Sequence, residues 1–322
     1  MNLPDEVDDP RALYEQLVEA EDSDGLPVLP PDADVVEACL AETPRAPDAV
    51  LAEIPADFVE LTVEQLAEVA VMAGCRPEYF PVVVAAFEAM NEWQNLRALT
   101  STTGGFWMAA IVNGPIIEEL SINNGTGLFG PGFRANATIG RAISLTFLAV
   151  GGVYPGDGTH ASHGFAGRYT NCFAEKGRSK PWSPLHVDLA GMAPEENAVT
   201  VTSAHAPHIT AEGFHGDREP EDILKAFARQ GAHAGASAAN EPGEVLYVLC
   251  DDHIEYLSQH YSKAEFKEYM YEHCRLPYTE RPLLSDPDDA LVVTAGGENI
   301  SSVIHTFTYT DDRAVTKPID RA

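Results

Sequence analysis

The chain has 322 residues, 45% of them hydrophobic, and its 50 acidic and 20 basic residues give a net charge of −30 at pH 7. This length is sufficient for a sizeable hydrophobic core in one large domain or two. The charge argues against nucleic acid and anionic membranes as partners, because both would be repelled. No stretch approaches the ~18 uninterrupted apolar residues that a membrane-spanning helix needs.

The N-terminus and the cysteines bear on the cellular compartment. The opening segment, MNLPDEVDDP, lacks the basic and apolar regions of a signal peptide, so we expect a cytoplasmic location. The five cysteines are an odd number and form no CxxC pair. This pattern favours reduced thiols over a disulfide framework.

Residues 1–60 are rich in proline and hold 17 acidic but only two basic residues. Two short helical patterns, at residues 13–18 and 35–40, are separated by prolines. We predict an acidic arm or small helical subdomain in residues 1–60, laid over an α/β catalytic core in residues 61–322. Because residues 1–22 contain few apolar side chains, we expect their removal to leave the core folded. The acidity is explained most simply by solubility, and docking on a basic partner is the alternative.

The segment after residue 60 contains clear helix signals. TVEQ has the form of a capping box with Thr62 as the cap and Gln65 three residues later. Gly74 is a typical C-terminal stop, and Pro77 suits the first position of a second helix. The sequence therefore predicts two helices joined by a tight link.

Cys75 lies in that link. The positive end of the second helix and the neighbouring Arg76 would stabilise a thiolate, so a lowered pKa is expected. Glu78 and Tyr79 follow closely enough to act as acid and base. The alternative is a buried structural cysteine, a common role for a free thiol.

A glycine-rich segment, NNGTGLFGPGFRANATIGR, precedes a predicted apolar helix at residues 135–150. Glycines before a helix allow backbone N–H groups to approach an anion, and Arg134 and Arg141 could add positive charge around Gly130. The pattern is neither a Walker A loop nor GxGxxG. We expect a site for a small carboxylate or phosphate, with a purely structural loop as the alternative.

The rest of the chain alternates strand and helix patterns, which predicts an α/β fold with a mixed sheet and flanking helices. No internal repeat is found in the sequence. A first strand is predicted at residues 106–112, with a short helix directly after it. Further strands are predicted at residues 169–174, 185–189, 198–204, 244–250 and 291–295, and helices at 219–231, 251–259 and 263–274. Asp251 or Asp252 would cap the second of these helices, and Gly296 would lie in a loop beside the ligand site.

Histidines cluster between residues 160 and 215. The members of this cluster are His160, His163, His186, His205, His208 and His215. HASH and HAPH each contain a pair of histidines three residues apart, a spacing that could hold zinc or iron. A metal site built on His186, His208 and Cys172, with Glu175 and Asp188 as further possible ligands, is therefore one alternative. Scattered core and surface histidines are the other.

Several long blocks carry a resemblance to a known family. They are SDGLPVLPP, VMAGCRPEYFPVVVAAFEAM, IVNGPI, INNGTGLFGPGFRANATIGRA, PWSPLHVD and SKAEFKEYMYEHCRLP. Together they resemble a bacterial family with GCRPEYFP and RANATIGR motifs, over most of residues 23–318. This family is associated with proteins that contain a UGSC-like domain, some of which carry selenocysteine.

The resemblance implies thiol or selenol chemistry in preference to a metal hydrolase. The chain has no UGSC motif of its own, so a selenol would have to belong to a partner protein. The positions that match the family's motifs are Cys75, Arg76, Glu78, Tyr79, Asn113, Asn123, Arg134, Asn136, Arg141, His186 and His208.

The combined expectation is a cysteine-centred enzyme, a lyase or thiol-dependent oxidoreductase, that acts on a small anionic substrate and needs no cofactor. Cys75, Glu78, Tyr79 and His186 would be catalytic. The substrate would be bound by Arg76, Asn113, Asn123, Gly130, Arg134, Asn136 and Arg141. A metal-dependent lyase or hydrolase and a non-catalytic subunit of a thiol or selenol enzyme are the alternatives, and a homo-oligomer is expected.

Overall fold

The computed structural model describes residues 9–56, 58–177, 180–210, 219–232, 242–276, 280–307 and 310–322. The fold is α/β, as the sequence predicts, with two four-stranded mixed sheets and a two-stranded hairpin. Within these ranges no helix has the length and apolar character needed to cross a bilayer.

The helices are α1 (Pro10–Glu19), α2 (Ala33–Leu40), α3 (Val63–Ala73), α4 (Phe80–Met90), α5 (Leu96–Ser101), α6 (Ile116–Glu119), α7 (Arg134–Ala149), α8 (Leu185–Ala190), α9 (Pro220–Gly231), α10 (Asp251–Leu257) and α11 (Lys263–His273). The strands are β1 (Val50–Ile54), β2 (Val59–Thr62), β3 (Trp107–Asn113), β4 (Cys172–Ala174), β5 (Ala198–Ala204), β6 (His208–Thr210), β7 (Val245–Leu249), β8 (Ala290–Thr294), β9 (Ser301–His305) and β10 (Val315–Pro318).

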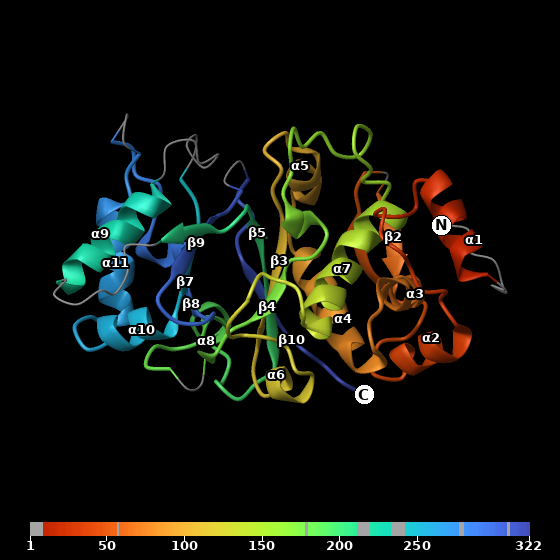
Figure 1. Ribbon diagram of the computed structural model, residues 1–322, viewed down its shortest axis with the longest axis horizontal. Coiled ribbons are helices and arrows are strands. Elements are labelled where there is room, and N and C mark those ends of the chain that lie inside the picture. Colours follow the sequence, from red (N-terminus) through yellow and green to blue (C-terminus); the bar gives the residue numbers. More distant parts are fainter. Residues whose placement is uncertain are drawn as a thin grey trace.

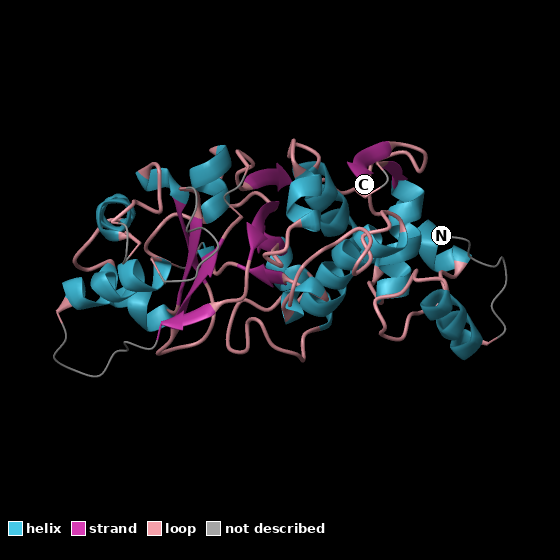
Figure 2. Cartoon of the chain, turned by 90° about the horizontal axis from the view of Figure 1, so that it is seen from above, coloured by secondary structure: helices cyan, strands magenta, loops and turns pink. Residues whose placement is uncertain are grey.

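The two larger sheets pack face to face, and helices cover the outer face of each (Figures 1 and 2). The first sheet has the order β10-β5-β3-β4, and the second has the order β6-β9-β7-β8. Helices α3, α4 and α7 pack outside the first sheet, and α9 and α11 pack outside the second.

Strand β3 shows why its sequence is apolar throughout. Met108, Ala110 and Val112 belong to the core shared with the helices, whereas Ala109 and Ile111 belong to the core between the sheets. Successive side chains of a strand point to opposite faces, so a strand covered on both faces must be apolar at every position.

The two sheets share one connectivity. Strand β3 pairs in parallel with β4 and antiparallel with β5, and β7 pairs in the same way with β8 and β9. Helices lie between the parallel strands in both halves, namely α6 and α7 in the first and α10 and α11 in the second. The fold therefore repeats a supersecondary unit that the sequence does not show as a repeat.

The helix signals around residue 70 are confirmed. Thr62 and Gln65 form a complete capping box at the start of α3, and Gly74 ends the helix in the left-handed conformation with φ of 92°. Pro77 begins a short 3-10 turn that leads directly into α4. These local rules hold because each one satisfies backbone groups that a helix end leaves unpaired.

The N-terminal region is part of the first core. The side chains of Leu13 and Leu17 on α1 are only 3% and 1% exposed. Strand β1 pairs with β2, so the boundary expected at residue 60 falls inside a hairpin. Residues 9–56 thus contribute side chains to the first core, and α1 buries Leu13 and Leu17 in it. That the core folds without residues 1–22 stays a prediction.

Two further predictions in the second half are wrong. Residues 185–189, predicted as a strand, belong to helix α8, which follows Pro184 and ends at Gly191 in the left-handed conformation. Cys250, and not Asp251 or Asp252, occupies the N-cap position of α10. Both aspartates lie in the first turn, where their charge still favours the helix.

Candidate active site

The carboxyl ends of the four parallel-paired strands β3, β4, β7 and β8 meet at one place. The N–H group of Lys176, after β4, donates to the carbonyl of Thr294 at the end of β8 (2.8 Å). The N–H group of Gly296 donates to the carbonyl of Asn124 (2.9 Å). Ligand sites in α/β proteins gather at such strand ends, where loops leave polar groups around a crevice.

A cavity of about 480 Å³ opens at this junction. We call it the His186 cavity. It is lined by Asn113, Gly114, Pro115, Ile117, Glu118, Asn124, Glu175, Lys176, Gly177, Pro184, His186 and Pro194. Its size suits a small molecule. The cavity brings together Asn113 and His186, two of the residues expected from the sequence.

Glu175 organises the cavity from beneath. Its buried carboxylate accepts hydrogen bonds from Asn113 Nδ2 (2.7 Å) and from the N–H groups of Leu185 (2.9 Å) and Thr294 (3.3 Å). Burial raises the pKa of Glu175 above its usual range, although Lys263 and these hydrogen bonds act in the opposite direction. Glu175 therefore ties β3, the start of α8 and the end of β8 to one carboxylate.

Asn113 presents an acceptor that no protein group satisfies. Its Nδ2 group faces Glu175, which fixes the orientation of the amide, and its buried Oδ1 atom has no hydrogen-bond partner among the described residues. The next residue, Gly114, has φ of 96°, and a Cβ atom there would lie 2.5 Å from the carbonyl oxygen of Glu196. Glycine at position 114 is thus required by the tight turn that ends β3.

His186 presents a second unsatisfied acceptor. Its Nε2 atom lies 3.1 Å from the carbonyl oxygen of Ala193. Because a carbonyl oxygen only accepts, Nε2 carries the hydrogen, and Nδ1 of the neutral ring is left with a lone pair. Nδ1 is buried and has no partner in the described part of the chain. Burial is the main influence on His186 and lowers its pKa, so the ring is neutral at pH 7.

Ion pairs hold the surrounding elements in place. Lys176 pairs with Asp251 at the start of α10 and donates to the carbonyl oxygen of Gly296 (2.6 Å). Lys263, at the start of α11, pairs with Asp188 on α8 at 2.5 Å. The helix that carries His186 is therefore anchored to both halves of the molecule.

The link between α3 and α4, which contains Cys75, and the glycine-rich segment also come together, at a different cavity. Arg134 donates from Nε and Nη2 to the carbonyl oxygen of Gly74 (3.2 and 3.0 Å). A cavity of about 390 Å³ lies beside this contact. Its lining residues are Arg76, Glu78, Tyr79, Glu119, Leu120, Ser121, Gly132, Phe133, Arg134 and Ala135. The N–H group of Gly130 pairs with the carbonyl of Gly127 (2.8 Å), and the segment continues into the first turns of α7, which begins at Arg134.

The expectation of a low pKa for Cys75 is wrong. The residue is buried, and its thiol donates to the carbonyl oxygen of Thr138 on α7 (3.3 Å). Burial raises the pKa of Cys75 to about 12, and this effect outweighs the opposing influence of the Thr138 hydrogen bond. Arg76, and not Cys75, is the N-cap residue of the following 3-10 turn. Cys75 therefore has the features of a structural thiol.

Other residues expected to bind substrate have structural partners. Arg141 forms a two-pronged ion pair with Asp24 (2.8 and 2.9 Å). The amide of Asn136 accepts from the N–H group of Asn123 (2.7 Å) and donates to the carbonyl oxygens of Asn123 and Cys172. These contacts fix the glycine-rich segment against β4, and they occupy the polar atoms that a ligand would need.

The residues of the expected metal site are not brought together. Among the described residues, no three His, Cys, Asp or Glu side chains form a group that could hold a metal ion. His208 lies on β6, where its ring packs edge-on against His305, and Cys172 is buried in β4, with its pKa raised to about 12 by burial. His215 lies outside the described residues.

Sequence reasoning missed the role of Glu175 and Lys176. The sequence indicates Glu175 only as a possible metal ligand and indicates no role for Lys176. The available signal was their position: the pair directly follows a predicted strand, and polar residues at the carboxyl end of a buried strand often line a site.

Comparisons with known proteins add no further constraint: no protein-family model, no curated protein and no solved structure matches the chain. The resemblance to the UGSC-associated family thus stays a hypothesis based on the motifs.

Proposed function

We propose that this protein is an enzyme that transforms a small polar molecule by acid–base catalysis in the His186 cavity. The observation that carries the proposal is the neutral His186 ring, whose Nδ1 lone pair is buried and unpartnered beside a cavity. An unpaired buried acceptor is costly, and it is tolerated where a ligand completes the hydrogen bonding.

Two residues have distinct roles in this proposal. His186 Nδ1 is the general base that removes a proton from the substrate. Asn113 Oδ1 accepts a hydrogen bond from a hydroxyl or amine group of the substrate and so orients it. Both free atoms are acceptors, and the proposed substrate therefore carries hydrogen-bond donors.

Glu175 is a positioning residue in this account. Its carboxylate orients the Asn113 amide and fixes the first residue of α8, which carries His186 next in sequence. Proton removal by a histidine is the first step of many eliminations and isomerisations. Carbon–heteroatom bond cleavage, one of the reactions expected from the sequence, falls within this class.

The test is a screen of polar metabolites incubated with the protein in D2O, with deuterium uptake measured by mass spectrometry. We expect the wild type to exchange a carbon-bound hydrogen of one compound class. Replacing His186 by Gln should slow this exchange by about 10²–10⁴-fold, the usual contribution of a general base.

His208→Gln is the matched control, because His208 lies on β6 and does not line the cavity. This variant should exchange at the wild-type rate. Exchange that continues at the wild-type rate in His186→Gln would contradict the proposal. Loss of exchange in both variants would favour the metal-dependent alternative, which uses His186 and His208 together.

A further inference from the structure

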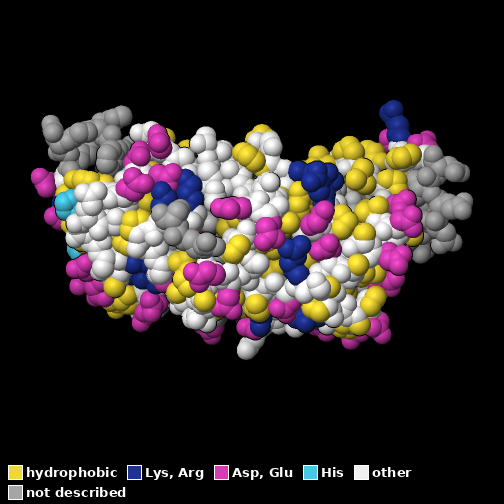
Figure 3. Space-filling view, turned by 90° about the horizontal axis from the view of Figure 1, so that it is seen from below, with side chains coloured by type: hydrophobic (Ala, Val, Ile, Leu, Met, Phe, Trp, Pro, Cys, Tyr) yellow, Lys and Arg dark blue, Asp and Glu magenta, His cyan; other side chains and the backbone are white. Residues whose placement is uncertain are grey.

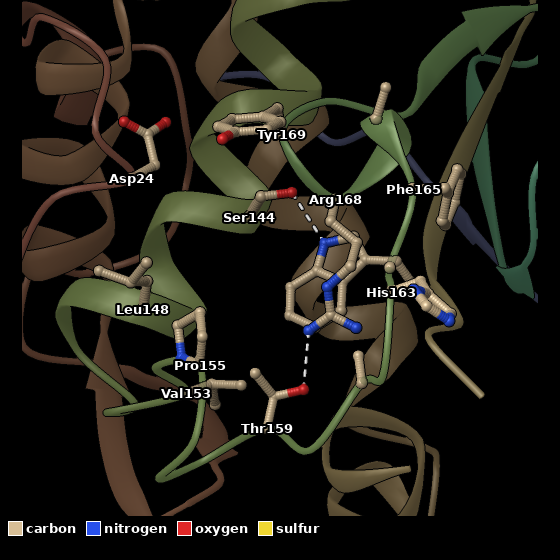
Figure 4. Close-up of a pocket in the computed structure, with 14 residues that line it drawn as sticks. Asp24, Ser144, Leu148, Val153, Pro155, Thr159, His163, Phe165, Arg168 and Tyr169 are labelled. Carbon is tan, nitrogen blue, oxygen red and sulfur yellow. Dashed lines mark hydrogen bonds between the residues drawn. The ribbon is translucent and has the colours of Figure 1, made fainter. Parts of the chain in front are cut away.

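A second cavity, of about 500 Å³, opens beside α7 and the loop that follows it (Figure 4). We call it the Arg168 cavity. Its lining residues are Asp24, Trp107, Ser144, Leu148, Val153, Pro155, Thr159, Ala161, His163, Gly164, Phe165, Ala166, Arg168 and Tyr169. It shares no lining residue with the His186 cavity. It is therefore a separate place for a ligand.

Arg168 is held rigidly in this cavity but has no anionic partner. Its Nη1 group donates to the carbonyl oxygen of Phe106 (3.1 Å), and its Nη2 group donates to Thr159 Oγ1 (3.0 Å). Its guanidinium carbon lies 4.1 Å from the centroid of the Trp107 ring. No carboxylate of the described residues forms an ion pair with it, and its other N–H groups have no protein acceptor there.

Partial burial of this charge is unfavourable without a counter-ion. Desolvation lowers the pKa of Arg168 to about 10, which still leaves the group charged at pH 7. Buried charges in proteins are normally paired, and breaking such a pair is strongly destabilising. An anion that accepts from the free N–H groups of the guanidinium would supply the missing counter-ion.

The opposite wall of the cavity is apolar. Leu148, Val153 and Pro155 lie across from Arg168 in Figure 4. The wall suits a hydrocarbon or aromatic group, which a bare phosphate or sulfate would not supply.

Ser144 offers a second donor on the Arg168 side. Its Oγ atom accepts from Trp107 Nε1 (2.8 Å), so its own O–H group remains available to donate. The hydroxyl and the guanidinium are thus held against the same indole ring.

The acidic residue of the lining does not neutralise Arg168. Asp24 is engaged by Arg141, which donates to both of its carboxylate oxygens. The chain as a whole carries a net charge of −30. The negative electrostatic potential of the chain repels polyanions such as nucleotides. Among anions, a ligand with a single negative charge is repelled least.

We propose that the Arg168 cavity binds a small organic monocarboxylate with a compact apolar or aromatic body. The carboxylate would accept from the free N–H groups of Arg168, whose planar fork matches a carboxylate in two-pronged geometry. The body would pack against Leu148, Val153 and Pro155. This site is additional to the His186 cavity and does not depend on the acid–base function proposed there.

The test is isothermal titration calorimetry on the full chain with three probes: benzoate, its neutral analogue benzamide, and inorganic sulfate. We expect benzoate to bind at one site and at least about tenfold more tightly than benzamide, because only the carboxylate forms a charge-assisted pair with Arg168. We expect sulfate to bind more weakly than benzoate, since it leaves the apolar wall uncovered.

Two variants locate the binding. Leu148→Trp fills the cavity and keeps every contact of Arg168, and it should abolish benzoate binding. Arg168→Lys keeps the charge but loses the planar fork, and it should weaken benzoate binding by about tenfold or more. Its melting temperature shows whether the fold survives. His186→Gln, in the other cavity, should bind benzoate as the wild type does.

Several results would overturn the proposal. Absent benzoate binding, equal affinity for benzoate and benzamide, or unchanged affinity in Leu148→Trp would each do so. Sulfate binding as tight as benzoate binding would show that the site is built for an inorganic anion and not for an organic one. Loss of benzoate binding in His186→Gln would show that benzoate binds in the His186 cavity.

Discussion

Burial disfavours the charged form of both His186 and Cys75, but the consequences for the chemistry of the two side chains are opposite. In both cases it favours the neutral form of the side chain. A neutral imidazole has the lone pair that a general base needs, whereas a neutral thiol lacks the thiolate that a nucleophile needs. The same physical effect thus supports His186 as a catalytic group and leaves Cys75 inert.

Thiol labelling tests the assignment of Cys75. With a pKa of about 12 and a buried thiol, Cys75 should not react with iodoacetamide at neutral pH in the folded protein. In urea it should react like an ordinary cysteine. Cys75→Ser serves as the control. Fast labelling of the native wild type that disappears in this variant would show that Cys75 is a reactive thiol that can act as a nucleophile.

Glu244 should make the protein less stable as the pH rises. Burial raises its pKa from 4.5 to about 7, and its carboxylate accepts from the N–H group of Ala314 (2.9 Å). The folded state therefore keeps the proton longer than the unfolded state does, and stability falls as the pH rises from the unfolded value through the folded one.

Glu244→Gln keeps an acceptor and removes the ionisation. The free energy of unfolding that the variant gains over the wild type should grow by about 2 kcal/mol between about pH 5.5 and about pH 8, measured by urea unfolding. The exposed Glu268→Gln is the control and should show no such growth. A gain that is constant or that shrinks with pH would disprove the shift at Glu244.

Among the elements, the sequence predicts best those whose ends are marked by local chemistry. Helix α3 has its capping box and its terminal glycine, and both are found in the structure. Helix α8 has only six residues, too few to display a helical period, and the sequence suggested a strand there. Its preceding proline and following glycine were the usable signals.

The site was predictable only in part. Asn113 was expected from the blocks that carry the family resemblance, and His186 was expected from those blocks and from the histidine cluster. The ion pair of Arg141 with Asp24 was not predicted, because the two residues are 117 positions apart in the sequence and no local pattern reveals such a pair. The burial of Cys75 beneath α7 is likewise a tertiary effect.

Helix α1 offers a direct test of the N-terminal region. Leu17 is 1% exposed and its neighbour Val18 is 39% exposed. Leu17→Ala should lower the free energy of unfolding by about 2–4 kcal/mol through lost burial and a cavity, whereas Val18→Ala should change it by less than about 0.5 kcal/mol. Urea unfolding measures both, and equally small losses would make α1 a dispensable arm.

At the scale of the whole molecule, the repeated connectivity explains where the site lies. In each half, the two parallel strands end at the same edge of the sheet, and face-to-face packing of the sheets brings these two edges together. The hydrogen bonds between Lys176 and Thr294, and between Asn124 and Gly296, cross this junction. The site thus depends on both halves, although the polar groups come mostly from the first.

The net charge should make stability dependent on salt. Acidic side chains are spread over the face in Figure 3 with separate groups of basic ones among them, and the chain as a whole has 50 acidic and 20 basic residues. Their mutual repulsion weakens as salt screens it, so the melting temperature should rise between about 0.01 and about 0.5 M sodium chloride. A melting temperature that falls would show that attractive ion pairs, such as Lys263 with Asp188, outweigh the repulsion.

The central claim is that His186 is neutral, carries its hydrogen on Nε2 and keeps a free lone pair on Nδ1. Long-range proton–nitrogen NMR on nitrogen-15-labelled protein measures this directly, and the spectrum of His186→Gln assigns the signal among the 11 histidines. We predict an unprotonated Nδ1 and a protonated Nε2 at neutral pH, with titration only below the ordinary value of 6.5. A charged ring at pH 7, or a hydrogen on Nδ1, would contradict the account.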